Sequence, residues 1–208
     1  MKMKMLPLLA LLLGAFAGTA SAETNVVLGA AVTTSGPGFD GWSSQWGAGA
    51  FAPASTVTDG VFVANQQTWN VGTVFWNGTG GGDDDNFVNI SLAGAVTVGS
   101  ITLQADNNDD YLIQYRDAGL SWRSLATISP PRSYGMTIGS AVLAIPVTTD
   151  AFRIRSVGGD GYYSVSEFQA YGTVAAVPEP GAYTMMVAGL GLLGLIARRR
   201  RAAGPGHN

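Results

Sequence analysis

The residue types that perform most nucleophilic and metal chemistry are almost absent from this 208-residue chain. It has no cysteine, which excludes disulfides, a thiolate nucleophile and cysteine-ligated zinc. Its one histidine, His207, lies in the polar stretch 204–208, where a Ser-His-Asp triad or a histidine metal site is not expected. The chemistry that remains is that of carboxylates, amides and aromatic rings.

Carboxylates gather at Asp59 and in the runs 83–85 and 106–110. Oxygen-rich loops of this kind hold calcium, but Asp and Asn are also common in solvated turns, which is our interpretation of residues 83–85. The run that starts at Asp106 has spacing like that of an EF-hand, yet Tyr111 stands where that loop requires glycine. We therefore expect no EF-hand.

Paired carboxylates would also be the minimum for a glycosidase. Asp109, Asp160 and Glu167 are available, but their spacing does not place two of them across a cleft. The chain has no Ser-x-x-Lys or Gly-x-Ser-x-Gly nucleophile motif. The sequence therefore indicates no catalytic residues.

Aromatic residues are the second group of interest. Sugar-binding β-sandwiches stack an aromatic ring on a pyranose and add polar groups from nearby loops. Most tryptophans in such domains fill the core, and we expect this of Trp69 and Trp122, which lie in strand-like sequence. The candidates for a ligand surface come from glycine-rich or acidic loops: Trp42, Trp46, Asp106, Asp109, Asp160, Tyr162 and Tyr163.

Charge is unevenly distributed along the chain. Six of the 11 basic residues lie at positions 2, 4 and 198–201, whereas all 14 acidic residues lie between Glu23 and Glu179. The segment between the basic ends holds five basic residues against 14 acidic ones, a net charge of −9. Such a segment repels phosphate backbones, so we expect no nucleic-acid partner.

Short β-rich runs separated by turn residues fill the middle of the chain, without helical periodicity. Expected strands are 26–33, 61–64, 71–76, 87–92, 96–105, 111–116, 122–128, 140–147, 151–157 and 163–171, with a tight turn at Ala93-Gly94. We find no internal repeat. This pattern predicts an all-β domain over residues 23–172, a single antiparallel β-sandwich of jelly-roll type.

Residues 1–22 have the three parts of a secretory signal peptide: two lysines, the apolar run 6–17 and small residues ending in Ala20-Ser21-Ala22. We expect a short signal helix and cleavage between Ala22 and Glu23. The expected partners are the Sec translocon and signal peptidase.

A second apolar segment follows the predicted domain. Residues 173–180 form a linker that contains Pro178-Glu179-Pro180, and the largely apolar stretch 181–197 comes next. At 1.5 Å per residue this stretch spans roughly 25 Å, the short limit for a bilayer. The cluster Arg198, Arg199, Arg200 and Arg201 opens the basic tail 198–208 and would stay cytoplasmic, which predicts a short transmembrane helix in the inner membrane.

This order of Pro-Glu-Pro triplet, short glycine-rich helix and arginine cluster resembles the PEP-CTERM sorting signal of Gram-negative bacteria, also classified as an ice-binding protein C-terminal domain. The resemblance implies an exosortase as partner and processing near the triplet. It also implies transient inner-membrane anchoring before delivery to the cell surface or exopolysaccharide matrix. The chain has no regular Thr-x-Thr array, so the ice-binding label is not taken as a function.

Other motifs occur in order along the predicted domain: Asp59-Gly60, then Thr68-Trp69, and a last strand that ends in Tyr171-Gly172. This order resembles the discoidin, or coagulation factor 5/8 type C, domain, which has the galactose-binding jelly roll. Here Thr68 and Trp69 are adjacent, and the gap after Gly60 is longer than is typical. The resemblance implies a structural calcium ion near Asp59, Thr68 and Glu167.

These features together predict a non-catalytic, exported surface or matrix protein that binds carbohydrate or exopolysaccharide. Two alternatives stay open. One is a structural matrix protein with no specific ligand, and the other is a carboxylate-dependent glycan hydrolase or lyase.

Overall fold

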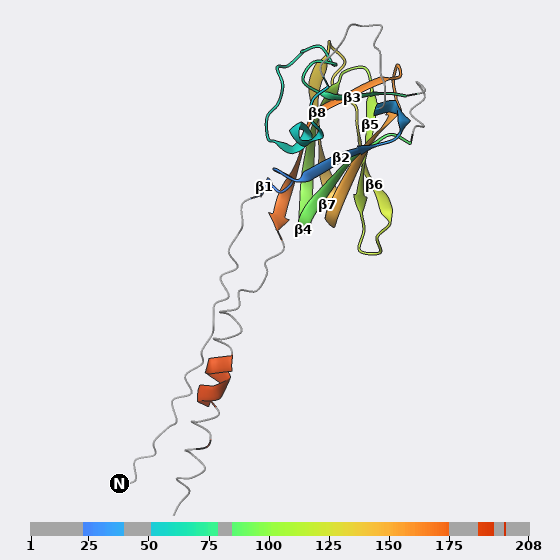
Figure 1. Ribbon diagram of the computed structural model, residues 1–208. Coiled ribbons are helices and arrows are strands. Elements are labelled where there is room, and N and C mark those ends of the chain that lie inside the picture. The colour runs from blue at the N-terminus through green and yellow to red at the C-terminus, as the bar shows by residue number, and fades with distance from the viewer. Residues whose placement is uncertain (1–22, 40–50, 79–84, 175–186, 194–197, 199–208) are drawn as a thin grey trace, which may run out of the picture.

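The computed structural model describes residues 23–39, 51–78, 85–174, 187–193 and 198 (Figure 1). Several predicted residues therefore lie outside the described part of the chain: Ala20, Ala22, Trp42, Trp46, Pro178, Glu179, Pro180, Arg199, Arg200 and Arg201.

The described chain forms strands β1 (Thr24–Asn25), β2 (Ala31–Ser35), β3 (Val74–Asn77), β4 (Phe87–Asp106), β5 (Asp110–Arg116), β6 (Trp122–Ile128), β7 (Met136–Gly158) and β8 (Tyr162–Val174). Two short 3-10 helices, η1 (Pro37–Phe39) and η2 (Ala54–Thr58), lie between β2 and β3. The mostly antiparallel β-structure confirms the all-β prediction.

The strands are joined in the order β1-β8-β4-β7-β5-β6, with β2 paired to β4 and β3 paired to β8. All of these pairs are antiparallel. The first part of β4 lies between β2 and β7, and the second part lies between β8 and β7. Because β4 and β7 take part in both layers, one hydrogen-bonded sheet folds over into a β-sandwich (Figure 1).

The predicted tight turn at Ala93-Gly94 is wrong, because β4 runs without a break from Phe87 to Asp106. The register with β7 shifts between Ser91 and Val96, so the turn-like residues occupy an irregularity inside a bending strand. In the same way, the predicted strands 140–147 and 151–157 are parts of the single strand β7. The alternation of apolar and polar residues, interrupted by Gly94, marks the position of the bend in β4. This pattern does not distinguish a bend within one strand from a turn that reverses the chain.

Residues 61–64 also differ from prediction, because they form a loop rather than a strand. The side-chain amide of Gln104 on β4 hydrogen-bonds both backbone groups of Val63 in this loop, as the backbone of a neighbouring strand would. Its Oε1 accepts from the Val63 N–H at 2.9 Å, and its Nε2 donates to the Val63 carbonyl at 3.0 Å. Residues 26–29 likewise form a turn, so β2 begins only at Ala31.

The core lies between the two layers and is rich in aromatic rings. Phe152 of β7 and Phe168 of β8 are both fully buried, with ring centroids 5.4 Å apart. Nearer β3, the Trp76 ring lies 5.7 Å from that of Tyr163 and 6.1 Å from that of Tyr111. The cluster of buried apolar residues extends from Val27 to Ala170.

Of the predicted C-terminal helix, residues 187–193 are described, and they are helical and exposed. Arg198 is helical and exposed as well. Within the described ranges, no helix combines the length and apolar character that a membrane crossing needs.

Candidate functional site

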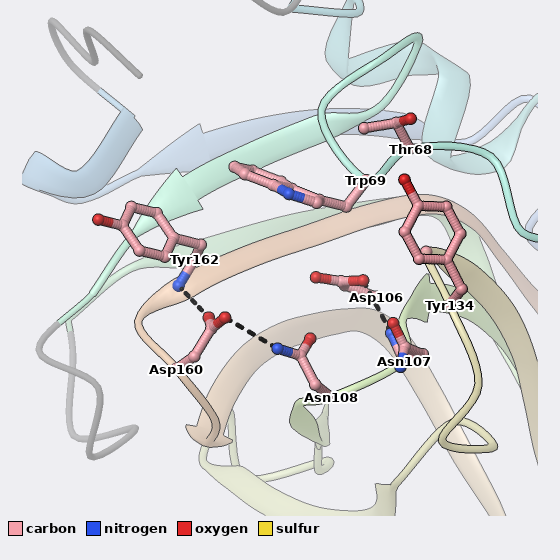
Figure 2. Close-up of a pocket in the computed structure, with 9 residues that line it drawn as sticks. Thr68, Trp69, Asp106, Asn107, Asn108, Tyr134, Asp160 and Tyr162 are labelled. Carbon is pink, nitrogen blue, oxygen red and sulfur yellow. Dashed lines mark hydrogen bonds between the residues drawn. The ribbon is translucent and has the colours of Figure 1, made fainter. Parts of the chain in front are cut away.

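One end of the sandwich holds a pocket of about 420 Å³ (Figure 2). The turn between β4 and β5, the loop before β7, the turn between β7 and β8 and the loop before β3 contribute to it. Its lining residues are Thr68, Trp69, Asp106, Asn107, Asn108, Tyr134, Gly135, Asp160 and Tyr162. The pocket therefore combines aromatic rings with acidic and amide side chains.

Trp69 forms the aromatic wall of the pocket. Its ring meets Phe75 edge-on at 5.7 Å and lies 6.0 Å from the ring of Tyr162. Its carbonyl accepts hydrogen bonds from Ser164 Oγ at 2.7 Å and from the hydroxyl of Thr73, which hold the loop in place. The prediction that Trp69 fills the core is wrong, because it precedes β3 and takes no part in the inward-facing alternation of that strand.

Asp106 and Asp160 supply the acidic part of the lining. In Figure 2 the Asp106 carboxylate lies beneath the Trp69 indole, with Tyr162 and Tyr134 to either side. Asp106 Oδ1 accepts from the Asn107 N–H at 2.9 Å. Asp160 uses both oxygens: Oδ1 accepts from the Tyr162 N–H at 2.9 Å, and Oδ2 accepts from Asn108 Nδ2 at 2.8 Å.

Asp109 lies behind this lining and is only 1% exposed. Its Oδ2 accepts from the Tyr111 hydroxyl at 3.0 Å, and its Oδ1 accepts from the Asp160 N–H at 3.3 Å. The Tyr111 hydroxyl in turn accepts from the Ser164 N–H at 3.0 Å. Asp109 therefore joins the β4–β5 turn to the β7–β8 turn and is a positioning group rather than part of the pocket surface.

Gly159 allows the Asp109 carboxylate to lie close to the backbone of the β7–β8 turn. Its φ is +138°, and a Cβ atom there would lie 1.9 Å from Asp109 Oδ1. Because only glycine combines this conformation with this space, the turn that carries Asp160 depends on it.

Two acids at this end, Asp106 and Asp109, have raised pKa values. Burial is the main cause for Asp109, whose pKa rises to about 8, with the Asp106 charge adding to the effect. Burial also raises the pKa of Asp106 to about 6, and the charge of Asp160 contributes while the Asn107 N–H opposes it. The ion pairs of the described chain, Arg116–Asp150 and Arg123–Asp117, involve none of these acids.

Glu167 of β8 belongs to a separate acidic site. Its Oε1 accepts from the Gly60 N–H and from Gln169 Nε2, each at 3.1 Å, whereas its Oε2 is buried with no hydrogen-bond partner. Burial first, and then the charge of Asp59, raises the pKa of Glu167 to about 7. Asp59 and Glu167 are thus brought together as predicted, but Thr68 lines the pocket instead.

The structure brings Asp106, Asp160 and Tyr162 together at the pocket, as predicted for a ligand surface. Tyr163, expected there too, is fully buried in the aromatic core, because neighbouring residues of a strand point to opposite faces. Trp122 is half-buried rather than in the core, and the guanidinium of Arg153 lies over its ring at 4.6 Å.

Sequence reasoning missed Tyr134, Asn107 and Asn108 as lining residues. Asn107 and Asn108 stand in the acidic run 106–110 and could have been included with it. Tyr134 follows Pro130-Pro131 in a turn-rich stretch before β7, and that position is the one signal that an exposed ring was available there.

Solved structures with the same fold include the family 32 carbohydrate-binding module of Streptococcus pneumoniae EndoD. It has a TM-score of 0.50 and 15% identity, over 72% of this chain and 100% of that chain. Chitosan-binding module 1 from the chitosanase/glucanase of Paenibacillus sp. IK-5 has a TM-score of 0.48 and 22% identity, over 72% of this chain and 99% of that one. The likeness to the family 32 module concerns the fold, which is the discoidin-like β-sandwich that the sequence resembles. No curated protein matches the sequence.

Residues 176–201 match the PEP-CTERM protein-sorting motif. This chain carries a PEP-CTERM sorting motif. The matched segment contains the predicted triplet Pro178-Glu179-Pro180 and all four arginines. The motif indicates an exported protein that is sorted to the cell surface.

The buried acids predict how stability depends on pH. Asp106 and Asp109 keep their protons to higher pH in the folded protein than in the unfolded chain, so the free energy of unfolding should fall between about pH 5 and about pH 8. Each pH unit over which one carboxyl is protonated only when folded corresponds to about 1.36 kcal/mol. Asp109→Asn should flatten this fall, as measured by urea unfolding at several pH values.

Asp117→Asn is the control for this experiment. Arg123 holds the pKa of Asp117 below its usual range, so Asp117 titrates below the pH window and its variant should keep the wild-type slope. A wild-type stability that stays constant or rises over this window would contradict the assignment.

Proposed function

We propose that this protein is an exported, non-catalytic carbohydrate-binding protein whose ligand lies in the pocket of Trp69 and Asp106. The observation that carries the proposal is the combination of the Trp69 and Tyr162 rings with the Asp106 carboxylate in one concave site. The ligand expected for an exported surface protein is an extracellular polysaccharide. The fold shared with a family 32 carbohydrate-binding module supports this proposal.

The pocket has the size and chemistry that a sugar needs. Its volume of about 420 Å³ lies in the range of small-molecule sites. A pyranose has an apolar C–H face, which packs against an indole, and a rim of hydroxyls, which needs hydrogen-bonding partners. Trp69 supplies the first, and Asp106, Asn108 and Tyr134 line the site beside it to supply the second.

The arrangement of the acids supports binding rather than hydrolysis. Both oxygens of Asp160 are occupied in holding the Tyr162 backbone and the Asn108 amide. Asp109 is buried behind the turn and does not line the pocket. Asp106 alone remains as an acid that faces the pocket, whereas glycosidases use a pair of acids across the scissile bond.

A Trp69→Ala variant tests the binding site. Binding of the full chain to immobilised polysaccharides should weaken by at least about tenfold, or about 1.4 kcal/mol, because the stacking wall is lost. Affinity gel electrophoresis against a panel of polysaccharides measures this. Trp122→Ala is the matched control, because Trp122 pairs with Arg116 at the opposite end of β5 from Asp110.

An equal loss of polysaccharide binding in both tryptophan variants would show that Trp69 affects binding only by stabilising the fold. That result would contradict the proposed site. Failure of the wild-type chain to bind any polysaccharide would favour a structural matrix protein. Release of shortened glycan would favour the hydrolase or lyase.

We further propose the route by which the protein reaches its destination. The Sec translocon exports it, signal peptidase cuts after Ala22, and the C-terminal segment anchors it in the inner membrane of a Gram-negative cell. An exosortase then processes it near Pro178-Glu179-Pro180 and releases it to the cell surface or extracellular matrix. The match of residues 176–201 to the sorting motif supports the exosortase step.

Replacing Pro178, Glu179 and Pro180 with alanine should leave the protein uncut in the inner membrane, because the processing enzyme reads the triplet. Cell fractionation and immunoblotting in an exosortase-containing host measure this. Pro205→Ala, outside the matched segment, should be processed normally. Normal processing of the triple variant would contradict the proposal.

We also propose that Asp59 and Glu167 contribute to a structural calcium site. Glu167 Oε2 is a buried carboxylate oxygen without a hydrogen-bond donor, which is a group that a cation would satisfy. The Asp59 charge raises the pKa of Glu167, so a calcium ion would relieve the repulsion between two ionised acids. Six to eight oxygens surround calcium, so backbone carbonyls or water would complete the site.

Calcium that binds only the folded protein should raise its melting temperature. The stabilisation is about 2.7 kcal/mol at a hundredfold excess over Kd. Glu167→Gln should remove the response. Asp117→Asn should retain it, because Asp117 is a half-buried acid that is paired with Arg123. The absence of any shift between calcium and EDTA, with no metal in elemental analysis, would contradict this site.

A further inference from the structure

Some of the side-chain oxygens that line the pocket receive no hydrogen bond from the described chain. Asp106 is 4% exposed, and the one hydrogen bond it receives within the described chain goes to Oδ1, so Oδ2 has no donor. The Asn108 side chain gives its Nδ2 to Asp160, and its Oδ1 is buried with no partner. Two side-chain oxygens of lining residues therefore receive no donor within the described chain, and of these Asn108 Oδ1 is buried.

The negative charge of the pocket also favours a ligand that brings hydrogen-bond donors. Asp106 and Asp160 line it, and no lysine, arginine or histidine is among the lining residues. Asp109 lies behind them, and the charges of Asp106 and Asp160 raise its pKa, while the charge of Asp160 also raises that of Asp106. A ligand that brings a positive charge would offset this repulsion, whereas a ligand that brings a carboxylate would increase it.

We propose that the pocket selects a sugar that carries a protonated amine, an amino sugar with a free ammonium group, over N-acetylated sugars and uronic acids. The inference rests on the carbohydrate-binding function proposed above and specifies its ligand class. An ammonium group has three donors and no acceptor, which suits Asp106 Oδ2, a lining oxygen that receives no donor within the described chain.

Trp69 fits the same ligand for a second reason. In the view of Figure 2 its indole lies above the Asp106 carboxylate, and both residues line the same pocket, so a sugar ring stacked on the indole would share the pocket with the acid. The face of an indole also attracts a cation, which adds to the preference for an ammonium group over a neutral amide. Acetylation of the amine would remove its attraction to the Asp106 carboxylate and to the indole face. It would also add a bulky, uncharged group.

A metal ion is the other cation that an acidic pocket could hold. Among the described residues, no three acidic or histidine side chains are placed to hold a metal ion together. Both oxygens of Asp160 already accept hydrogen bonds, which leaves Asp106 as the main free carboxylate. The geometry therefore favours a cation that brings its own hydrogen-bond donors over a bare ion.

The test compares three sets of oligosaccharides on the full chain, purified in non-ionic detergent. The pH is set just above 6, so that the Asp106 carboxyl, with a pKa of about 6, is largely ionised while the sugar amine keeps much of its proton. They are β-1,4-linked glucosamine oligomers, the same oligomers fully N-acetylated, and uronic acid oligomers of similar length. Isothermal titration calorimetry should show the free-amine series binding at least about tenfold tighter than the acetylated one, with the uronic acid series weakest. Added salt should reduce this advantage.

Variants then test which residues cause the tighter binding of the free-amine oligomers. Asp106→Asn should remove most of the preference for the free amine while retaining residual binding, and Trp69→Ala should weaken both series. Asp117→Asn, an acid distant from the pocket, should retain the full preference. Because the wild-type comparison needs no variant, poor folding of Asp106→Asn would leave the test intact.

The outcomes separate this inference from the function on which it rests. Equal affinity for free and acetylated oligomers, or tighter binding of uronic acids, would overturn the amine preference while carbohydrate binding stands. No binding of any oligosaccharide or polysaccharide would overturn both. Loss of binding to the free-amine series in EDTA would replace the ammonium group with a metal ion and would also overturn the inference.

Discussion

The pairing of β4 with β7 over nearly their whole lengths is the constraint on which the rest of the structure depends. It runs from Val88 opposite Ile154 to Asp106 opposite Met136, through both layers of the sandwich. Its last register pair places the loop that holds Tyr134 beside Asp106. The pairing of β5 with β7 then sets Asp110 opposite Gly158, which brings the turn of Asp160 to the same end. The pocket is thus a consequence of strand register.

Asp109 shows how this register is secured at the pocket. A buried carboxyl is costly unless its oxygens are hydrogen-bonded, and those of Asp109 accept from Tyr111 and from the backbone of Asp160. The same bonds couple two turns that are distant in sequence. Burial raises the pKa of Asp109 although these hydrogen bonds lower it, and Gly159 provides the space for the contact. Holding Asp109 in this buried position therefore reduces stability at higher pH, where the carboxyl must ionise.

The fold also places the two ends of the described β-domain away from the pocket. β8 begins at Tyr162, beside the pocket, and ends at Val174, and its 13 residues span roughly 40 Å. β1 pairs with the far end of β8, where Thr24 lies opposite Gly172. Both ends of the domain therefore meet away from the pocket. A domain held through either end would leave the pocket free to meet a polysaccharide.

The sequence by itself determined the all-β class and the sorting motif, because alternation, turn residues and short contiguous signals are local properties. It also singled out Asp106, Asp160 and Tyr162, which stand in loops of distinctive composition and line one pocket in the structure. Only the tertiary structure decided that β4 and β7 are continuous, that Trp69 faces a pocket and that Tyr163 does not. These depend on strand register and on side-chain direction across residues as far apart as Trp69 and Tyr162, which no local pattern encodes.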